Sequence, residues 1–115
     1  MTRDRHPITP EPGLLIEEFT IPARGGYEIS LRHYRSARET GKLPVLVYIH
    51  GGGWAIGSLE TDDPLCRRLA RELGLGVVNV EYRLAPEWKF PTGVEDCFDV
   101  VKWVWKSSLS WSASI

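Results

Sequence analysis

The sequence predicts an α/β fold in which an antiparallel hairpin precedes a parallel βαβα segment covered by helices. Three patterns in the 115 residues predict it. Residues 27–34 alternate between apolar and polar side chains, which is typical of a half-buried strand. Residues 45–49 and 76–80 are apolar, β-branched runs, typical of strands inside a parallel sheet. Residues 63–73 and 94–105 repeat apolar side chains with helical spacing.

The N-terminal part is expected to form an irregular arm and then the hairpin. Residues 1–14 contain three prolines, which remove backbone donors and favour irregular structure. A strand over residues 14–21 ends at Pro22, and Gly25 and Gly26 favour a turn before the second strand. One face of that second strand carries Tyr27, Ile29, Leu31 and His33, and the other carries Glu28, Ser30 and Arg32. Residues 35–42 are polar and predict a loop.

A βαβ unit is expected to follow. Asp63 is interpreted as the N-cap of its helix, Pro64 as the first helical residue and Gly74 as the terminator. The apolar face of this helix consists of Leu65, Cys66, Leu69, Ala70 and Leu73. The helix joins the runs 45–49 and 76–80, which are therefore expected to pair as parallel strands.

A proline-bracketed loop over residues 83–93 leads to the second helix. The apolar stripe of that helix consists of Val94, Cys97, Phe98, Val101, Val104 and Trp105. Asp62, Asp63 and Asp96 are interpreted as helix-start charges, and Cys66 and Cys97 as core residues. Residues 107–115 form a serine-rich segment without periodicity.

The composition excludes several classes of protein. The formal net charge is −1, so nothing predicts binding to nucleic acid or to an anionic membrane. The longest apolar run is too short to span a membrane, and two cysteines cannot form a disulfide scaffold. No secretory signal is visible, so a cytoplasmic location is expected. No metal-ligand spacing is present, and no metal is expected.

The most informative segment runs from His50 to Gly57 and contains three consecutive glycines, Gly51, Gly52 and Gly53. It follows an expected parallel strand and precedes a helix, which is where open α/β sheets bind ligands. Backbone N–H groups of consecutive glycines can converge on one negative charge because no Cβ intervenes. The segment therefore predicts a site for a phosphate or for the oxyanion of an acyl-transfer intermediate.

Two motifs carry a resemblance to a known family. His50-Gly51-Gly52-Gly53-Trp54 is followed about thirty residues later by Glu81-Tyr82-Arg83-Leu84-Ala85-Pro86-Glu87. Over residues 15–106 the chain resembles the N-terminal part of the hormone-sensitive-lipase-type branch of the α/β hydrolases (α/β-hydrolase fold-3), which are carboxylesterases and lipases. The implied fold is an incomplete α/β-hydrolase sheet.

The resemblance also implies residue roles. It places the oxyanion hole at Gly51, Gly52 and Gly53, with His50, Trp54 and Gly57 supporting the loop and its pocket. Tyr82, Arg83, Pro86 and Glu87 are implied to be structural. The implied substrate is a small ester or acyl compound, with no cofactor.

The sequence lacks the nucleophile motif of this family and the triad residues that follow it. No Gly-x-Ser-x-Gly segment is present, no Asp or Glu follows residue 99, and no histidine follows His50. We therefore expect a truncated fragment that is inactive alone, with residues 45–49 as an exposed edge through which it self-associates. The alternatives are a non-catalytic small-molecule-binding protein of the same superfamily and one half of a split hydrolase.

Overall fold

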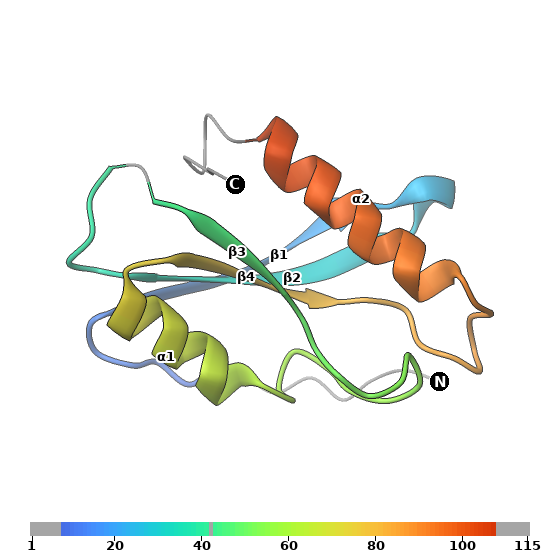
Figure 1. Ribbon diagram of the computed structural model, residues 1–115, viewed down its shortest axis with the longest axis horizontal. Helices are drawn as coiled ribbons and strands as arrows, with labels where there is room; N and C mark the ends of the chain where they lie inside the picture. Colours follow the sequence, from blue (N-terminus) through green and yellow to red (C-terminus); the bar gives the residue numbers. More distant parts are fainter. Residues whose placement is uncertain (1–7, 42, 108–115) are drawn as a thin grey trace.

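The computed structural model describes residues 8–41 and 43–107, and Figure 1 shows a mixed sheet between two helices. Strand β1 (Leu14–Pro22) and β2 (Glu28–Ser36) flank a 3-10 turn, η1 (Arg24–Gly26). Strand β3 (Val45–Ile49), helix α1 (Asp63–Leu73), strand β4 (Gly76–Glu81) and helix α2 (Thr92–Lys106) follow. The predicted α/β class and the order of elements are confirmed.

The sheet has the strand order β1-β2-β4-β3. β1 and β2 form the predicted antiparallel hairpin, and β3 pairs with β4 in parallel from Val45↔Gly76 to Ile49↔Val80. β2 joins the two halves by pairing antiparallel with β4. β2 and β4 are therefore the inner strands, whereas β3 lies at an edge of the sheet formed by the described residues.

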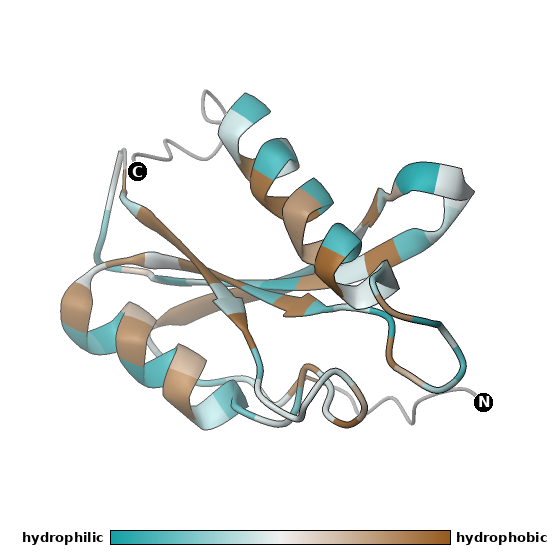
Figure 2. Ribbon diagram, turned by 45° about the vertical axis from the view of Figure 1, so that its right-hand side comes forward, coloured by the Kyte–Doolittle hydropathy of each residue, from teal (hydrophilic) through white to brown (hydrophobic). Residues whose placement is uncertain are grey.

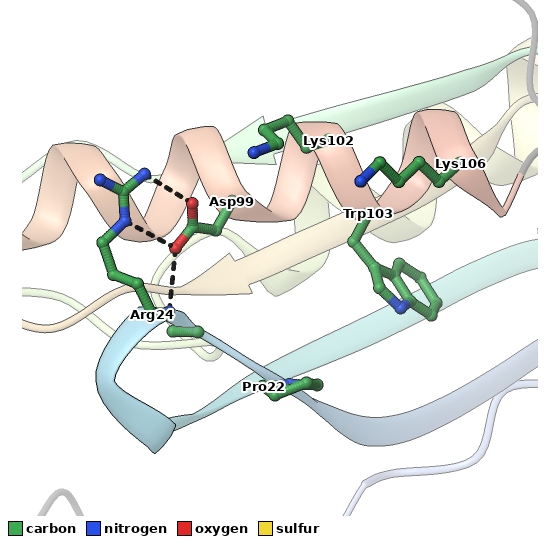
Figure 3. Close-up of a pocket in the computed structure, with 7 residues that line it drawn as sticks. Pro22, Arg24, Asp99, Lys102, Trp103 and Lys106 are labelled. Atoms are coloured by element: carbon green, nitrogen blue, oxygen red, sulfur yellow. Dashed lines mark hydrogen bonds and ion pairs between the residues drawn. The ribbon is translucent and has the colours of Figure 1, made fainter.

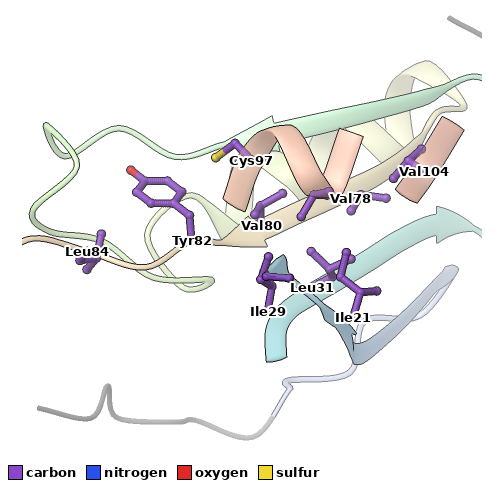
Figure 4. Close-up of a cluster of buried hydrophobic side chains, with 11 residues drawn as sticks. Ile21, Ile29, Leu31, Val78, Val80, Tyr82, Leu84, Cys97 and Val104 are labelled. Carbon is purple, nitrogen blue, oxygen red and sulfur yellow. The ribbon is translucent and has the colours of Figure 1, made fainter. Parts of the chain in front are cut away.

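Each face of the sheet carries one helix and one apolar cluster. Side chains of β1, β2 and β4, among them Leu31 and Val80, pack against Val100 and Val104 of α2 (Figure 4). On the opposite face, Tyr34 and Val77 pack against Cys66 and Ala70 of α1. Both cysteines are buried, as expected. In the described part of the chain neither helix is long and apolar enough to cross a membrane.

The second strand is not half-buried. β2 extends to Ser36, two residues beyond the predicted end, and both of its faces are covered from Leu31 to Tyr34. Arg32, expected on a polar face, is only 2% exposed. Because α1 covers the face to which Arg32 and Tyr34 point, that face is buried although its side chains are polar.

Helix α1 begins one residue earlier than predicted, with Asp62 at the N-cap and Asp63 inside the first turn. Asp63 is buried in ion pairs and does not cap the helix. Gly74 ends the helix in the left-handed conformation, as predicted. Leu65 and Leu73 of the expected apolar face are exposed, because only a narrow strip around Cys66 and Ala70 contacts the sheet.

Helix α2 buries only part of the predicted apolar stripe, Cys97 and Val104. Its buried residues are Gly93, Asp96, Cys97, Val100 and Val104. The other four residues of the predicted stripe are exposed, namely Val94, Phe98, Val101 and Trp105. The residues of the expected serine-rich segment from 108 onward lie outside the described residues.

Candidate functional site

The glycine segment begins where β3 ends, at the carboxyl end of the parallel strand pair. The neighbouring strand β4 ends at the same edge, and its last residues lead into Tyr82 and Arg83. The two sequence motifs, about thirty residues apart in the chain, therefore meet at one end of the sheet (Figure 1).

His50 and Tyr82 hold the start of the loop. The two rings stack with their centroids 4.3 Å apart, and His50 is buried. The Tyr82 hydroxyl donates to the His50 carbonyl oxygen at 2.8 Å. His50 Nδ1 lies 2.8 Å from the Gly51 carbonyl oxygen, so that nitrogen carries the proton. The Nδ1 atom of His50 is thereby hydrogen-bonded to the backbone of the loop itself.

Two glycines of the loop have no room for a side chain. A Cβ on Gly52, whose φ is +133°, would lie 2.1 Å from the carbonyl oxygen of Ile56. A Cβ on Gly57, whose φ is +116°, would lie 2.3 Å from His50 Nδ1. The loop coils tightly between them, since the Gly52 carbonyl accepts hydrogen bonds from the N–H groups of Ala55 and Ile56. The backbone geometry thus requires glycine at both positions.

The N–H groups of the three consecutive glycines remain available to a ligand. Within residues 8–41 and 43–107, the N–H groups of Gly51, Gly52 and Gly53 donate no hydrogen bond. Gly51 and Gly53 are exposed. Next to them, Trp54 has φ +67°, and its carbonyl oxygen accepts from the Ala85 N–H at 2.8 Å. N–H donors of consecutive glycines that make no hydrogen bond within the protein are suited to binding an anion.

The far end of the loop is anchored to β4 through Leu59. The Leu59 side chain is buried, and its carbonyl accepts from Asn79 Nδ2 at 2.9 Å. Its N–H approaches Glu81 Oε1 at 3.5 Å. Sequence reasoning gave no role to Asn79 or Glu81. Polar side chains inside an otherwise apolar strand were the available signal, because buried polar groups need hydrogen-bond partners.

A buried charged cluster joins the hairpin to the start of α1. Arg32 donates to Glu18 and Glu60, each at 2.6 Å, and to Asp63 at 2.9 Å. Burial favours neutral Asp63, but the hydrogen bonds from Tyr34, Arg67 and Arg32 outweigh it and hold the pKa of Asp63 below its usual value. Glu60 belongs to the loop, so the cluster also fixes where the loop ends.

The second motif supports the first. The Arg83 guanidinium makes a bidentate ion pair with Asp96 of α2. The backbone N–H of Arg83 donates to the same carboxylate at 2.8 Å. Tyr27 and Trp88 lie against the guanidinium. Asp96 is completely buried. Its interpretation as a helix-start charge was wrong, because the acidic residue in the first turn of α2 is Glu95. Pro86 and Glu87 are exposed.

The cavity beside the loop is small. It measures about 20 Å³ and is lined by Trp54, Arg83, Ala85, Trp88, Phe90, Gly93 and Val94. A larger open hollow of about 600 Å³ lies between the hairpin turn and α2, and no residue of the glycine loop lines it (Figure 3). Among the described residues, no group of three or more His, Cys, Asp or Glu is placed to hold a metal ion.

Comparisons with known proteins agree on one family. The profile described as "alpha/beta hydrolase fold" matches residues 46–115. Carboxylesterase NlhH of Mycobacterium tuberculosis is 44% identical over 93 residues, 81% of this chain and 29% of the relative. Ethyl acetate hydrolase of Pseudomonas putida is 40% identical over 91 residues, 77% of this chain and 29% of the relative.

Solved structures indicate the same family. An esterase of Pyrobaculum calidifontis is 50% identical, with a TM-score of 0.80 over 87% of this chain and 31% of the esterase. A bacterial heroin esterase is 40% identical, with a TM-score of 0.84 over 90% of this chain and 33% of the esterase. The chain thus spans about a third of the length of the proteins it matches. It belongs to the α/β-hydrolase fold family and corresponds to the N-terminal part of the hormone-sensitive-lipase-type esterases.

Proposed function

We propose that this chain contributes the oxyanion-binding loop of a serine carboxylesterase. The observation that carries the proposal is the set of N–H groups on Gly51, Gly52 and Gly53 at the carboxyl end of β3, for which the described residues supply no acceptor. In this proposal they stabilise the oxyanion of the tetrahedral intermediate. One such donor is typically worth about 2.7–4 kcal/mol of transition-state stabilisation. A further N–H comes from the residue after the nucleophile.

The surrounding residues have supporting roles in this proposal. His50 braces the loop through the Gly51 carbonyl and is not the general base, and Gly57 provides the space that the His50 ring occupies. Trp54 borders the substrate pocket and packs on Tyr82 at 4.8 Å. Arg83 keeps Tyr82 in place through its ion pair with Asp96, whereas Pro86 and Glu87 shape the exposed loop.

The chain by itself is proposed to be catalytically silent. Its sequence contains no Gly-x-Ser-x-Gly segment. Loss of the triad costs about 2 × 10⁶ in kcat in a serine hydrolase whose other parts are intact. The substrate class of the completed site is proposed to be small carboxylic esters, in keeping with the names of the relatives. The cavity beside the glycine loop, about 20 Å³, does not favour small-molecule binding at this loop by the chain alone, since ligand pockets usually measure about 300–1,000 Å³.

The first test is hydrolysis of p-nitrophenyl butyrate by the purified chain, for which we expect no turnover above buffer. Turnover that disappears in a Gly52→Ala variant would contradict this expectation.

The second test uses a chimera in which residues 15–106, the proposed hydrolase portion, replace the matching segment of the Pyrobaculum calidifontis esterase. The chimera is expected to hydrolyse the ester. Gly52→Ala should lower its kcat by roughly 10²–10³, the typical cost of an oxyanion donor that no longer reaches its acceptor, because the added Cβ clashes with the Ile56 carbonyl and displaces the loop. Gly41→Ala is the control, because Gly41 also has a positive φ, +75°, but lies outside the loop. Equal losses in the two variants would refute the assignment.

The edge strand provides a further element of the proposal. Among the described residues β3 pairs with a strand on one side only, β4. Residues 45–49 are therefore proposed to mediate self-association, because unpaired apolar edges pair with other chains. Light scattering should show association that increases with concentration. A monomer at all concentrations would refute it.

A further inference from the structure

A buried arginine joins the hairpin to the end of the glycine loop. Arg32 lies on β2, and its side chain is 2% exposed. It contacts three carboxylates from three different segments: Glu18 of β1, Glu60 of the loop and Asp63 of α1. The closest atoms are 2.6, 2.6 and 2.9 Å apart, respectively. One buried cation therefore ties the loop to both strands of the hairpin and to α1.

Stability alone gives no reason for this arrangement. Taking charges out of water is costly, and replacing a buried ion pair with apolar residues of similar volume is often neutral or stabilising. Charge-assisted hydrogen bonds are short and directional, so a planar guanidinium fixes the positions of the carboxylates around it. The geometry around Arg32 is therefore better explained by positioning than by stability.

Of the three carboxylates, only that of Glu60 belongs to the segment between β3 and α1, which carries the glycines. Figure 2 shows a hydrophilic N-terminal end of α1 at the point where this segment joins it. There the Tyr48 hydroxyl of β3 also donates to Asp62 at 2.8 Å. Charged and polar contacts thus hold the far end of the loop against the sheet.

A short stretch of backbone connects Glu60 to the glycines. Glu60 lies four residues beyond Ile56. The N–H of Ile56 donates to the Gly52 carbonyl, and a Cβ on Gly52 would lie 2.1 Å from the Ile56 carbonyl oxygen. Because Ile56 and Gly52 are in such close contact, a shift of Glu60 that reaches Ile56 also moves Gly52.

A second contact holds the stretch between Ile56 and Glu60. The Leu59 carbonyl accepts from Asn79 at 2.9 Å, but both groups are neutral. Hydrogen bonds between charged groups are roughly twice as strong as neutral ones. The contact between Arg32 and Glu60 is therefore the stronger of the two.

We propose that Arg32 is a positioning residue for the glycine loop and acts on it through Glu60. The effect on catalysis rests on the proposed function: there, Arg32 keeps the glycine N–H groups directed at the oxyanion. The effect on the geometry of the loop does not depend on that function and is tested separately.

Glu18→Ala is the matched control for Glu60→Ala. Both carboxylates lie 2.6 Å from the same nitrogen of Arg32, but Glu18 belongs to β1 and not to the loop. Glu18 also accepts from Arg32 Nε and is less exposed, 27% against 38%. Glu18→Ala should therefore lower the urea midpoint of the full chain at least as much as Glu60→Ala. An effect on the loop that is confined to Glu60→Ala is then not due to lost stability.

Hydrogen exchange of the full chain tests the positioning without any measurement of activity. The amides of Ala55 and Ile56 report on the loop, because both donate to the Gly52 carbonyl. In Glu60→Ala they should exchange on the order of tenfold faster than in the unchanged chain, and in Glu18→Ala at the unchanged rate. Glu60→Gln should restore part of the protection, because its amide oxygen still accepts from Arg32. Equal rates in Glu60→Ala and Glu18→Ala would overturn the proposal.

The esterase chimera described above tests the effect on catalysis. Glu60→Ala should lower its kcat by roughly 10–10²-fold with KM nearly unchanged, because misplaced donors stabilise the transition state less. Glu18→Ala should leave kcat nearly unchanged. An active chimera whose kcat does not respond to Glu60→Ala would overturn the proposal. A chimera that is inactive without any substitution, together with the expected exchange rates, would refute the proposed function and uphold the positioning of the loop.

Discussion

The ion pair between Arg83 and Asp96 provides the sharpest test of how this structure is stabilised. Asp96 has no exposed surface, the Arg83 side chain is 9% exposed, and their closest atoms are 2.8 Å apart. Asp96→Asn removes the negative charge at constant size and leaves the guanidinium buried without a counter-charge. Removing one partner of a buried pair costs about 3–5 kcal/mol. Because an amide oxygen still accepts from the Arg83 N–H, we expect about 3 kcal/mol, measured by urea unfolding of the monomer.

Asp99→Asn is the matched control for this experiment. Asp99 lies three residues further along α2 and also pairs with an arginine, but Arg24 is 49% exposed. Exposed pairs contribute little because water solvates both charges, so the loss should be much smaller than for Asp96→Asn. The double variant Arg83→Gln/Asp96→Asn should recover part of the stability, since it removes both charges. Equal losses in the two single variants would refute the view that burial gives the Arg83 pair its importance.

Three further predictions follow from other parts of the structure. Burial, with a smaller contribution from Arg35, lowers the pKa of His33 from 6.5 to about 4. The unfolded chain therefore binds the extra proton first, and stability should fall by about 3 kcal/mol between pH 6.5 and 4; a His33→Gln variant that keeps the same pH profile would contradict this. Gly57→Ala should destabilise the chain more than Gly53→Ala, because only the first introduces a clash, with His50, and thermal melts of the two variants decide it. Burial raises the pKa of Cys66 and Cys97 to about 12, so a thiol reagent at pH 8 should label the folded chain far more slowly than the urea-unfolded chain, and equal rates would refute their burial.

Local patterns were enough to locate most elements of this fold. The alternation before Ser36, the apolar run at 45–49 and the glycine at 74 depend on residues close together in the chain, and the strands and helices appear where these patterns predicted. The glycine loop also lies where the sequence predicted, directly after β3, whereas its role as an anion site stays a prediction.

The patterns failed where charged residues are buried. Judged from their neighbours in the chain alone, three charged residues would be placed at the surface, because an isolated charge is costly to bury. They are Arg32, Asp63 and Asp96. Each is buried because partners from distant segments supply hydrogen bonds. The partner of Arg32 on α1 is 31 residues away, and that of Asp96 on the loop after β4 is 13 residues away.

The sequence alone determined the class of fold, the positions of the strands and helices, and the loop that binds an oxyanion in the proposed function. Only the tertiary structure decided that β4 lies between β2 and β3, which face of α2 is buried, and that Phe98 and Trp105 remain exposed next to an open strand edge. Helical and strand periodicity records which side chains are apolar. The packing of distant segments decides which of those apolar faces is covered.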